Sequence, residues 1–168
     1  AFWSILGDHG ISCNILRVPL TFPPEKFAGA MLSAMCVPDL RGTQGSFTYY
    51  STDPAEVHGN DEAPEGTGGQ RALVTVQGDR VEASLPGPED PVHAEHQPLP
   101  LPFTLQLAPE QGEAVLRIGG QRCRLKVREY SDWLRLEWHP APGMRVHGIA
   151  RFYITRLERT PEGVSLGL

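Results

Sequence analysis

The stretch Glu113-Ala-Val-Leu-Arg-Ile-Gly-Gly-Gln-Arg-Cys-Arg-Leu-Lys-Val127 decides the fold class of this chain. On both sides of the glycine pair Gly119-Gly120, apolar and polar residues alternate. A period of two is typical of strands that bury one face. Two such runs joined by adjacent glycines predict a tight antiparallel hairpin.

The same alternation continues on both sides of this hairpin. Upstream, residues 73–76 and 81–85 flank the turn signal Gln77-Gly-Asp-Arg80, and residues 103–107 alternate strictly. Downstream, residues 133–138 and 146–157 predict longer strands. We therefore predict a mainly β fold, with an antiparallel sandwich or open barrel over residues 71–168.

Prolines interrupt this pattern between residues 86 and 102. We expect that segment to be an extended connection outside any ladder, because proline has no N–H to donate. Proline and glycine are frequent throughout, with 16 Pro and 18 Gly among 168 residues. Such a composition favours strands and turns over helices.

Residues 1–50 follow a different pattern. Residues 2–9 predict a short helix with Gly10 as its stop, and the apolar run 11–18 predicts a central strand buried on both faces. Residues 28–37 predict a further strand or extended segment. Because one αβ unit cannot complete a sheet, we expect residues 1–50 to belong to a larger α/β core.

The remaining segments complete the predicted domain plan. Residues 51–70 are rich in Asp, Glu, Gly and Pro, which predicts a linker or long loop. Residues 163–168 begin as a strand without a closing turn. Together with the incomplete αβ unit, this run leads us to expect a longer parent chain.

Net charge argues against two classes of partner. The formal charge of −5 offers no basic field to a nucleic acid or to an anionic membrane surface. No apolar run approaches the roughly 20 residues that cross a bilayer. We therefore expect neither nucleic acid nor membrane as a partner.

The cysteines Cys13, Cys36 and Cys123 form no C-x-x-C pair. Cys13 lies in an apolar run and Cys123 alternates with two arginines, which favours buried thiols. A disulfide or a reactive cysteine is the alternative. Buried thiols favour a reducing compartment such as the cytoplasm.

Two motifs carry a family resemblance. Asn14-Ile-Leu-Arg-Val-Pro-Leu-Thr-Phe-Pro-Pro24 and Met35-Cys-Val-Pro-Asp-Leu-Arg-Gly-Thr-Gln-Gly-Ser-Phe47 resemble an internal stretch of the type I phosphodiesterase branch of the alkaline phosphatase superfamily. Residues 150–154 are similar to a closing stretch of that family. The resemblance covers residues 1–50 and 143–168, and it is weak between them.

This resemblance implies that the parent hydrolyses phosphate esters or diesters with two divalent metals, zinc by analogy. The family's catalytic residues lie on segments before and after this one. The chain would then be a non-catalytic cap or accessory segment, inactive alone, that shapes substrate access. Its partners would be the remainder of the parent chain and the parent's phosphate-ester substrate.

Of all segments, the loop after residues 11–18 is the one that we expect nearest to the site of phosphate-ester hydrolysis. It leaves the carboxyl end of the predicted strand, where ligands gather in open α/β sheets. Pro23 and Pro24 would form a rigid wall of the cleft, while Asp39 and Arg41 would orient substrate or the loop. The alternative is that the prolines only end the strand.

The six histidines do not suggest a metal site within the chain. Asp8-His9 looks like the zinc-binding pair of that superfamily, but its position favours a helix end, where His complements the dipole. His93 and His96 fall in a Pro-rich loop with no helix to align them. The others stand apart along the sequence: His58, His139 and His147.

Alternating cations mark the strand 121–128. Four basic residues share one face, which predicts a solvated outer face rather than an anion site: Arg122, Arg124, Lys126 and Arg128. We expect Glu129, Glu137 and Glu158 to offset them from neighbouring strands.

A second functional hypothesis is a self-contained β-sandwich that binds carbohydrate or a protein partner. Its binding platform would be the exposed aromatic residues Tyr130, Trp133, Trp138 and Tyr153. Aromatic residues in alternating strands belong to the core more often than to the surface. Apolar surface left by an unpaired strand would also favour self-association.

Overall fold

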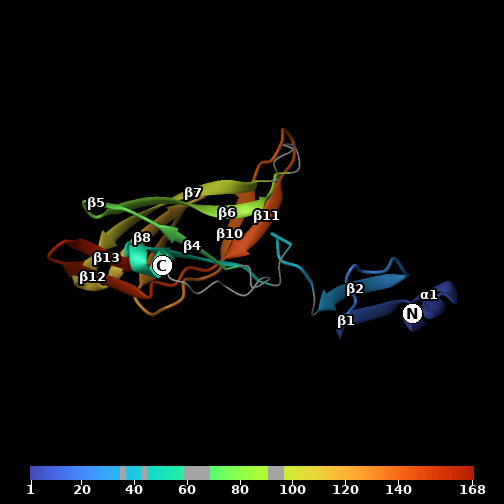
Figure 1. Cartoon of the computed structure of the whole chain (residues 1–168). Coiled ribbons are helices and arrows are strands. Elements are labelled where there is room, and N and C mark those ends of the chain that lie inside the picture. Colours follow the sequence, from blue (N-terminus) through green and yellow to red (C-terminus); the bar gives the residue numbers. More distant parts are fainter. Residues whose placement is uncertain (35–36, 43–44, 59–68, 91–96) are drawn as a thin grey trace. The chain divides into compact units, whose positions relative to one another are not determined.

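The computed structural model describes residues 1–34, 37–42, 45–58, 69–90 and 97–168 (Figure 1). They form a mainly β protein with several sheets and, over these ranges, no closed barrel. The prediction of a mainly β fold is therefore confirmed. The chain divides into two compact units, Ala1–Asp39 and Leu40–Leu168. The division falls before the boundary predicted at residue 50.

The first unit holds one helix and two parallel strands. Helix α1 (Phe2–Asp8) ends before Gly10, whose φ of 77° suits a glycine stop. Strand β1 (Cys13–Pro19) pairs in parallel with β2 (Gly29–Ala34). The predicted helix and both predicted strands are confirmed.

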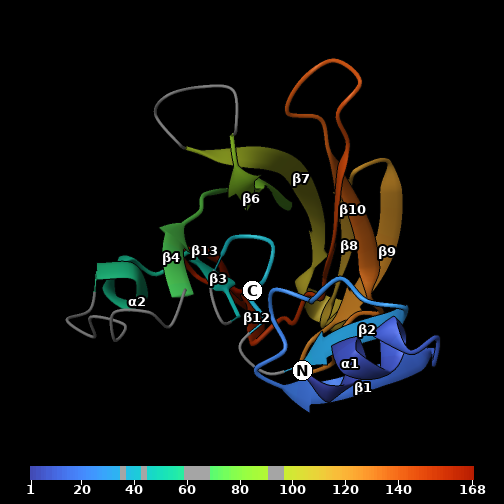
Figure 2. The same ribbon diagram turned by 90° about the vertical axis from the view of Figure 1, so that its right-hand side faces the viewer.

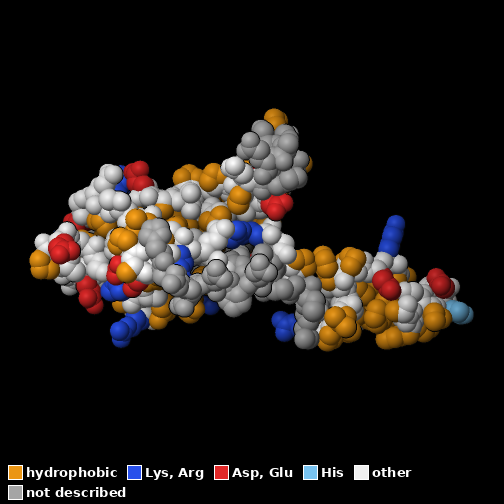
Figure 3. Space-filling view, in the orientation of Figure 1, with side chains coloured by type: hydrophobic (Ala, Val, Ile, Leu, Met, Phe, Trp, Pro, Cys, Tyr) orange, Lys and Arg blue, Asp and Glu red, His pale blue; other side chains and the backbone are white. Residues whose placement is uncertain are grey.

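The predicted burial of β1 on both faces is wrong for this unit. Ile15 is the only buried residue of β1, whereas Leu16 is 65% exposed. A two-stranded sheet with one short helix has no further layer to cover its faces. Hydrophobic side chains accordingly lie on the surface of the first unit (Figure 3).

The largest sheet of the second unit is an antiparallel meander. Its strands follow one another in chain order: β5 (Val76–Gln77), β6 (Arg80–Glu89), β7 (Pro98–Ala108), β8 (Glu113–Ile118) and β9 (Gln121–Lys126). A 3-10 helix, η1 (Pro109–Gln111), joins β7 to β8. The hairpins predicted at residues 77–80 and at Gly119-Gly120 are both confirmed.

The prediction that residues 86–102 stay outside any ladder is wrong. Pro86 pairs with Pro100, and Ser84 pairs with Pro102, in the β6–β7 ladder. In an antiparallel pair every second residue points its N–H away from the partner. Prolines spaced two apart can therefore all occupy the outward positions without losing a ladder bond.

A second sheet has the order β12-β13-β3-β4 and combines distant segments. It contains β3 (Phe47–Ser51), β4 (Gly69–Leu73), β12 (Arg156–Thr160) and β13 (Gly163–Gly167). Strands β3 and β4 are parallel, and helix α2 (Pro54–His58) lies in the connection between them, beside β4 (Figure 2). The predicted linker 51–70 therefore contains a helix and strand ends, and its residues 59–68 lie outside the described part.

A third sheet pairs β10 (Leu134–Trp138) with β11 (Val146–Ala150). The single strand predicted over residues 146–157 is divided, because β11 ends at Ala150 and β12 begins at Arg156. The residues between β11 and β12 no longer pair with β10. Two of them form isolated bridges, Tyr153 with Tyr130 and Ile154 with Val127.

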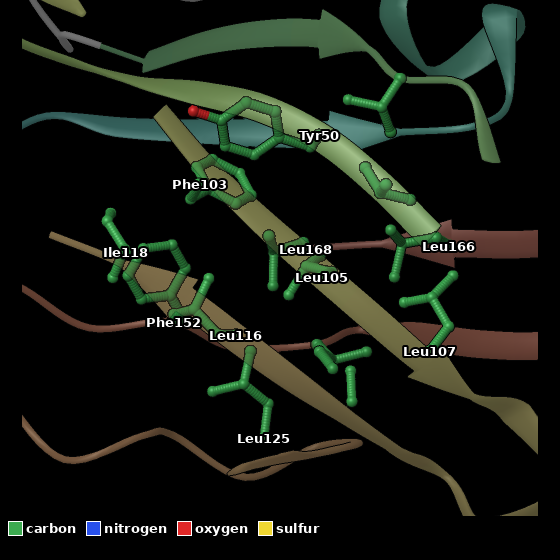
Figure 4. Packing of buried hydrophobic residues seen from close by; sticks show 14 of the residues in the cluster. Tyr50, Phe103, Leu105, Leu107, Leu116, Ile118, Leu125, Phe152, Leu166 and Leu168 are labelled. Carbon is green, nitrogen blue, oxygen red and sulfur yellow. The ribbon is translucent and has the colours of Figure 1, made fainter. Parts of the chain in front are cut away.

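One hydrophobic core draws on all three sheets of the second unit. Phe103 of β7 contacts the rings of Tyr50 and Phe152 edge-on, with centroids 5.2 and 5.9 Å apart (Figure 4). Leu166 of β13 and Leu116 of β8 are fully buried. Burial of large apolar side chains from distant segments makes this unit the stable part of the chain.

No helix in the described ranges has the length and apolar character needed to span a membrane.

Candidate functional site

The loop after β1 carries the predicted Pro23 and Pro24, and both are exposed. The Thr21 hydroxyl donates to the Val18 carbonyl at 2.7 Å, and the Ser33 hydroxyl donates to the Thr21 carbonyl. Because β1 and β2 are parallel, these bonds fix the start of the loop at the carboxyl ends of both strands. The two prolines extend from this fixed base into solvent.

Glu25 ties the far end of the same loop to helix α1. Its Oε2 accepts hydrogen bonds from Trp3 Nε1 at 2.8 Å and from the Ser4 hydroxyl at 3.0 Å. These two hydrogen bonds lower the pKa of Glu25, because they stabilise the carboxylate. The loop is thus anchored at both ends within the first unit.

Asp39 and Arg41 fall in different units. Asp39 closes the first unit, whereas Arg41 belongs to the second. Arg41 lies near Tyr50, but burial outweighs its charge and raises the pKa of Tyr50 to about 12. The predicted cleft role of Pro23, Pro24, Asp39 and Arg41 therefore stays a prediction.

The strongest polar cluster centres on Glu56 of α2, which the sequence did not single out. Arg156 of β12 forms a bidentate pair with it, Nη1 to Oε1 at 2.7 Å and Nη2 to Oε2 at 3.0 Å. The hydroxyls of Ser51 and Tyr49 also donate to Oε2. A capping signal, Asp53-Pro-Ala-Glu56, was present in the sequence, and Asp53 Oδ1 accepts the Ala55 N–H at 2.9 Å.

These donors lower the pKa of Glu56 to about 2, with the Arg156 hydrogen bonds as the largest cause. The pair also raises the pKa of Arg156. A carboxylate held in its charged form by an arginine and two hydroxyls is a poor general base. The Glu56 cluster therefore acts as an anchor that joins α2 to β3 and β12.

A groove of about 480 Å³ lies along β3, β4, β6 and β7. Its described lining includes Thr48, Tyr50, Gln70, Arg71 and Ser84 together with prolines of β6 and β7. These described lining residues offer hydroxyl, amide and guanidinium groups that can hydrogen-bond a ligand. This chemistry suits binding.

The described histidines take part in local contacts. His9 Nδ1 lies 2.9 Å from the Ile5 carbonyl at the end of α1, and His139 and His147 both contact Glu137. His93 and His96 lie outside the described residues. Over the described ranges, no group of three or more His, Cys, Asp and Glu side chains is placed to hold a metal ion.

The four alternating cations are exposed, as predicted, but β9 ends at Lys126, so Arg128, with a φ of 62°, lies outside the strand. The acidic partner found for Arg124 is Glu113 of β8, at 3.5 Å, rather than one of the three predicted glutamates. Cys13 and Cys123 are half-buried free thiols, and Cys36 lies outside the described residues. Burial, with a smaller effect of Asp132, raises the pKa of Cys123.

The predicted aromatic platform is only partly exposed. Trp138 is buried, and a Cβ placed on Gly87 would lie 2.2 Å from its indole nitrogen. Tyr153 is half-buried, whereas Tyr130 and Trp133 are exposed. The sequence did not single out Arg151, which stacks against both exposed rings.

The chain was compared with protein-family models, curated proteins and solved structures. No protein-family model, no curated protein and no solved structure matches this chain.

Proposed function

We propose that this chain is a non-catalytic cap segment of a metal-dependent phosphodiesterase or phosphohydrolase. In this proposal the first unit belongs to the parent's α/β core. The second unit, a sandwich or open barrel, covers the cleft and restricts which substrates enter. The metals, zinc by resemblance, and the nucleophile would be held by other segments of the parent.

The observation that carries this proposal is the exposed parallel pair β1–β2. Sheets made only of parallel strands occur almost only in proteins that cover both faces of the sheet. Here Leu16, Leu20 and Leu32 are 65%, 79% and 56% exposed. Neighbouring strands and helices of a larger α/β sheet would bury these side chains.

The loop after β1 gives the proposal its link to substrate. The start of this loop is held at the carboxyl ends of β1 and β2, where open α/β sheets bind ligands, and the exposed Pro23 and Pro24 follow it. Asp39 and Arg41 follow on the chain that leads from this sheet into the second unit. A small displacement there would disturb a bound phosphate ester.

Turnover of an aryl phosphodiester by three samples tests the proposal: the parent protein, the present 168 residues, and the parent without residues 40–168. We expect turnover by the parent, none by the chain alone, and altered substrate preference after the deletion. Asp39→Ala or Arg41→Ala in the parent should lower kcat/KM more than Arg124→Ala. Metal-dependent turnover by the isolated chain, above a heat-inactivated control, would overturn the proposal.

A second candidate function is supported by a separate observation. Tyr130 and Trp133 are 63% and 60% exposed on the second unit, and Arg151 stacks against both rings. Exposed aromatic residues beside a cation are frequent in binding surfaces. The second unit would then bind carbohydrate or a protein, whether or not the parent is a phosphohydrolase.

A further inference from the structure

Arg151 lies between two exposed aromatic side chains. Its guanidinium carbon is 4.4 Å from the centroid of the Tyr130 ring and 5.1 Å from that of Trp133. Cation–π contacts of this length hold the guanidinium in place. Tyr130 and Trp133 remain 63% and 60% exposed, although the Tyr130 ring also contacts Tyr153, with centroids 4.7 Å apart. We call these three residues, Tyr130, Trp133 and Arg151, the aromatic clamp.

The backbone beneath the aromatic clamp is firmly held. Buried Ser131 donates its N–H to the Phe152 carbonyl at 2.9 Å, and its hydroxyl accepts the Phe152 N–H at 3.0 Å. The Arg128 N–H donates to the Ile154 carbonyl at 2.8 Å. Phe152 and Ile154 are both buried in the core. The aromatic clamp therefore stands on two joined segments, so little ordering is needed when a ligand binds.

The hydrogen-bonding capacity of Arg151 is largely unused. Its Nε donates to the Ser131 carbonyl at 3.2 Å, which fixes the plane of the guanidinium. Within the described part of the chain no carboxylate pairs with it, although Glu129 and Asp132 lie in the segment that carries Tyr130 and Trp133. Its two terminal amino groups form a fork that matches the two oxygens of a carboxylate.

The net charge limits what this fork can bind. At −5 the chain repels polyanions such as nucleic acid. A single carboxylate is different, because exposed charges further apart than about 8 Å are screened at physiological salt. The preferred ligand combines one local negative charge with a rigid apolar face that can lie on an aromatic ring.

We propose that the aromatic clamp binds an acidic saccharide. Arg151 takes the carboxylate of a uronate, and the C–H face of the sugar ring packs on Tyr130 or Trp133. Peptide recognition uses backbone bonds to a strand edge, a groove or a cluster of arginines. The aromatic clamp offers one arginine between two rings, and the groove along β3, β4, β6 and β7 is lined by other residues. An acidic peptide is therefore the alternative outcome of the test. This inference rests on the second candidate function and not on the cap role.

A matched pair of ligands tests the proposal on the full 168-residue chain. Galacturonate and its methyl ester have the same sugar ring, but only the first carries a single carboxylate. We expect calorimetric or NMR titration to show binding of the acid about tenfold tighter than the ester, which is the effect of a charged hydrogen bond. Arg151→Gln should abolish that preference, and Trp133→Ala or Tyr130→Ala should weaken binding of both forms.

The matched control is Arg122→Gln, an exposed arginine of β9 outside the aromatic clamp. Thermal melts confirm that each variant is folded. The proposal is overturned if acid and ester bind equally, if Arg122→Gln removes the preference as Arg151→Gln does, or if neither saccharide binds while an acidic peptide does. Binding of the ester alone would leave a carbohydrate module but reject the role of Arg151. None of these outcomes bears on turnover by the parent.

Discussion

Glu56 is the residue that attaches helix α2 to the sheet. Its carboxylate accepts hydrogen bonds from Arg156, Ser51 and Tyr49, and its backbone carbonyl accepts one from Arg71 at 3.0 Å. The helix has only five residues and would not persist in isolation. Side-chain bonds to β3, β4 and β12 therefore determine its position.

This attachment predicts a pH-dependent loss of stability. The pKa of Glu56 in the folded chain, about 2, lies below the ordinary 4.5. The carboxylate therefore adds stability above pH 4.5, and this contribution is lost as the pH falls toward 2. The side chains of Glu56 and Arg156 are 30% and 31% exposed, so we expect Glu56→Gln to cost about 1 to 2 kcal/mol at pH 7.

Urea denaturation at several pH values measures this difference. The gap between Glu56→Gln and the unmodified chain should close as the pH falls from 5 toward 2. Glu110→Gln is the control, because Glu110 also bonds an arginine, Arg159, at 2.6 Å but is 70% exposed. An equal loss for both variants, or a gap that does not change with pH, would contradict the assigned anchoring role.

Sequence reasoning could find residues whose partners are near in the chain, and it missed those whose partners are distant. Gly10 and Gly119-Gly120 act locally and were predicted correctly. Glu56 and Arg156 are 100 residues apart, so nothing in either segment indicates the pair. Arg151 is a further case, because its two aromatic neighbours come from another segment joined to it by isolated bridges.

At the scale of elements, the β6–β7 ladder shows why prolines can occupy a strand. Pro86 pairs with Pro100, and neither residue has an N–H to donate, so this is a non-hydrogen-bonded pair. The next pair, Leu85 with Leu101, must then exchange ladder bonds. A loop was predicted from the number of prolines in this segment. Their spacing of two residues, which is compatible with a ladder, was not taken into account.

This alternation predicts that substitutions at the neighbouring positions 101 and 102 change the free energy of unfolding by different amounts. Leu101→Pro removes a ladder donor and should destabilise the chain by about 2 to 4 kcal/mol. Leu101→Ala controls for the lost side chain and should cost less. Pro102→Ala, at an outward position, should change the free energy of unfolding by less than about 1 kcal/mol. Equal effects of Leu101→Pro and Leu101→Ala in urea denaturation would show that the N–H of residue 101 is not in the ladder.

At the scale of the whole molecule, two units differ in how completely they bury their apolar residues. The second unit encloses a core in which Leu105, Leu116 and Ile154 are at most 1% exposed. The first unit buries Ile15 and Thr21 but leaves most of the apolar side chains of β1 in solvent. The alternation of apolar and polar residues, with a period of two, correctly predicted a mainly β second unit. The apolar run 11–18 predicted a buried strand because its composition fits a covered parallel sheet, and this unit lacks that cover.

Hydrogen exchange of the 168-residue chain tests the central proposal, that the second unit is self-sufficient and that the first belongs to a larger sheet. In a sample shown to be monomeric by light scattering, we expect strong amide protection in β7, β8 and β9. Amides of β1 and β2 should exchange within seconds to minutes, because a two-stranded sheet is marginal in water. Protection of β1 equal to that of β8 in the monomer would contradict the account.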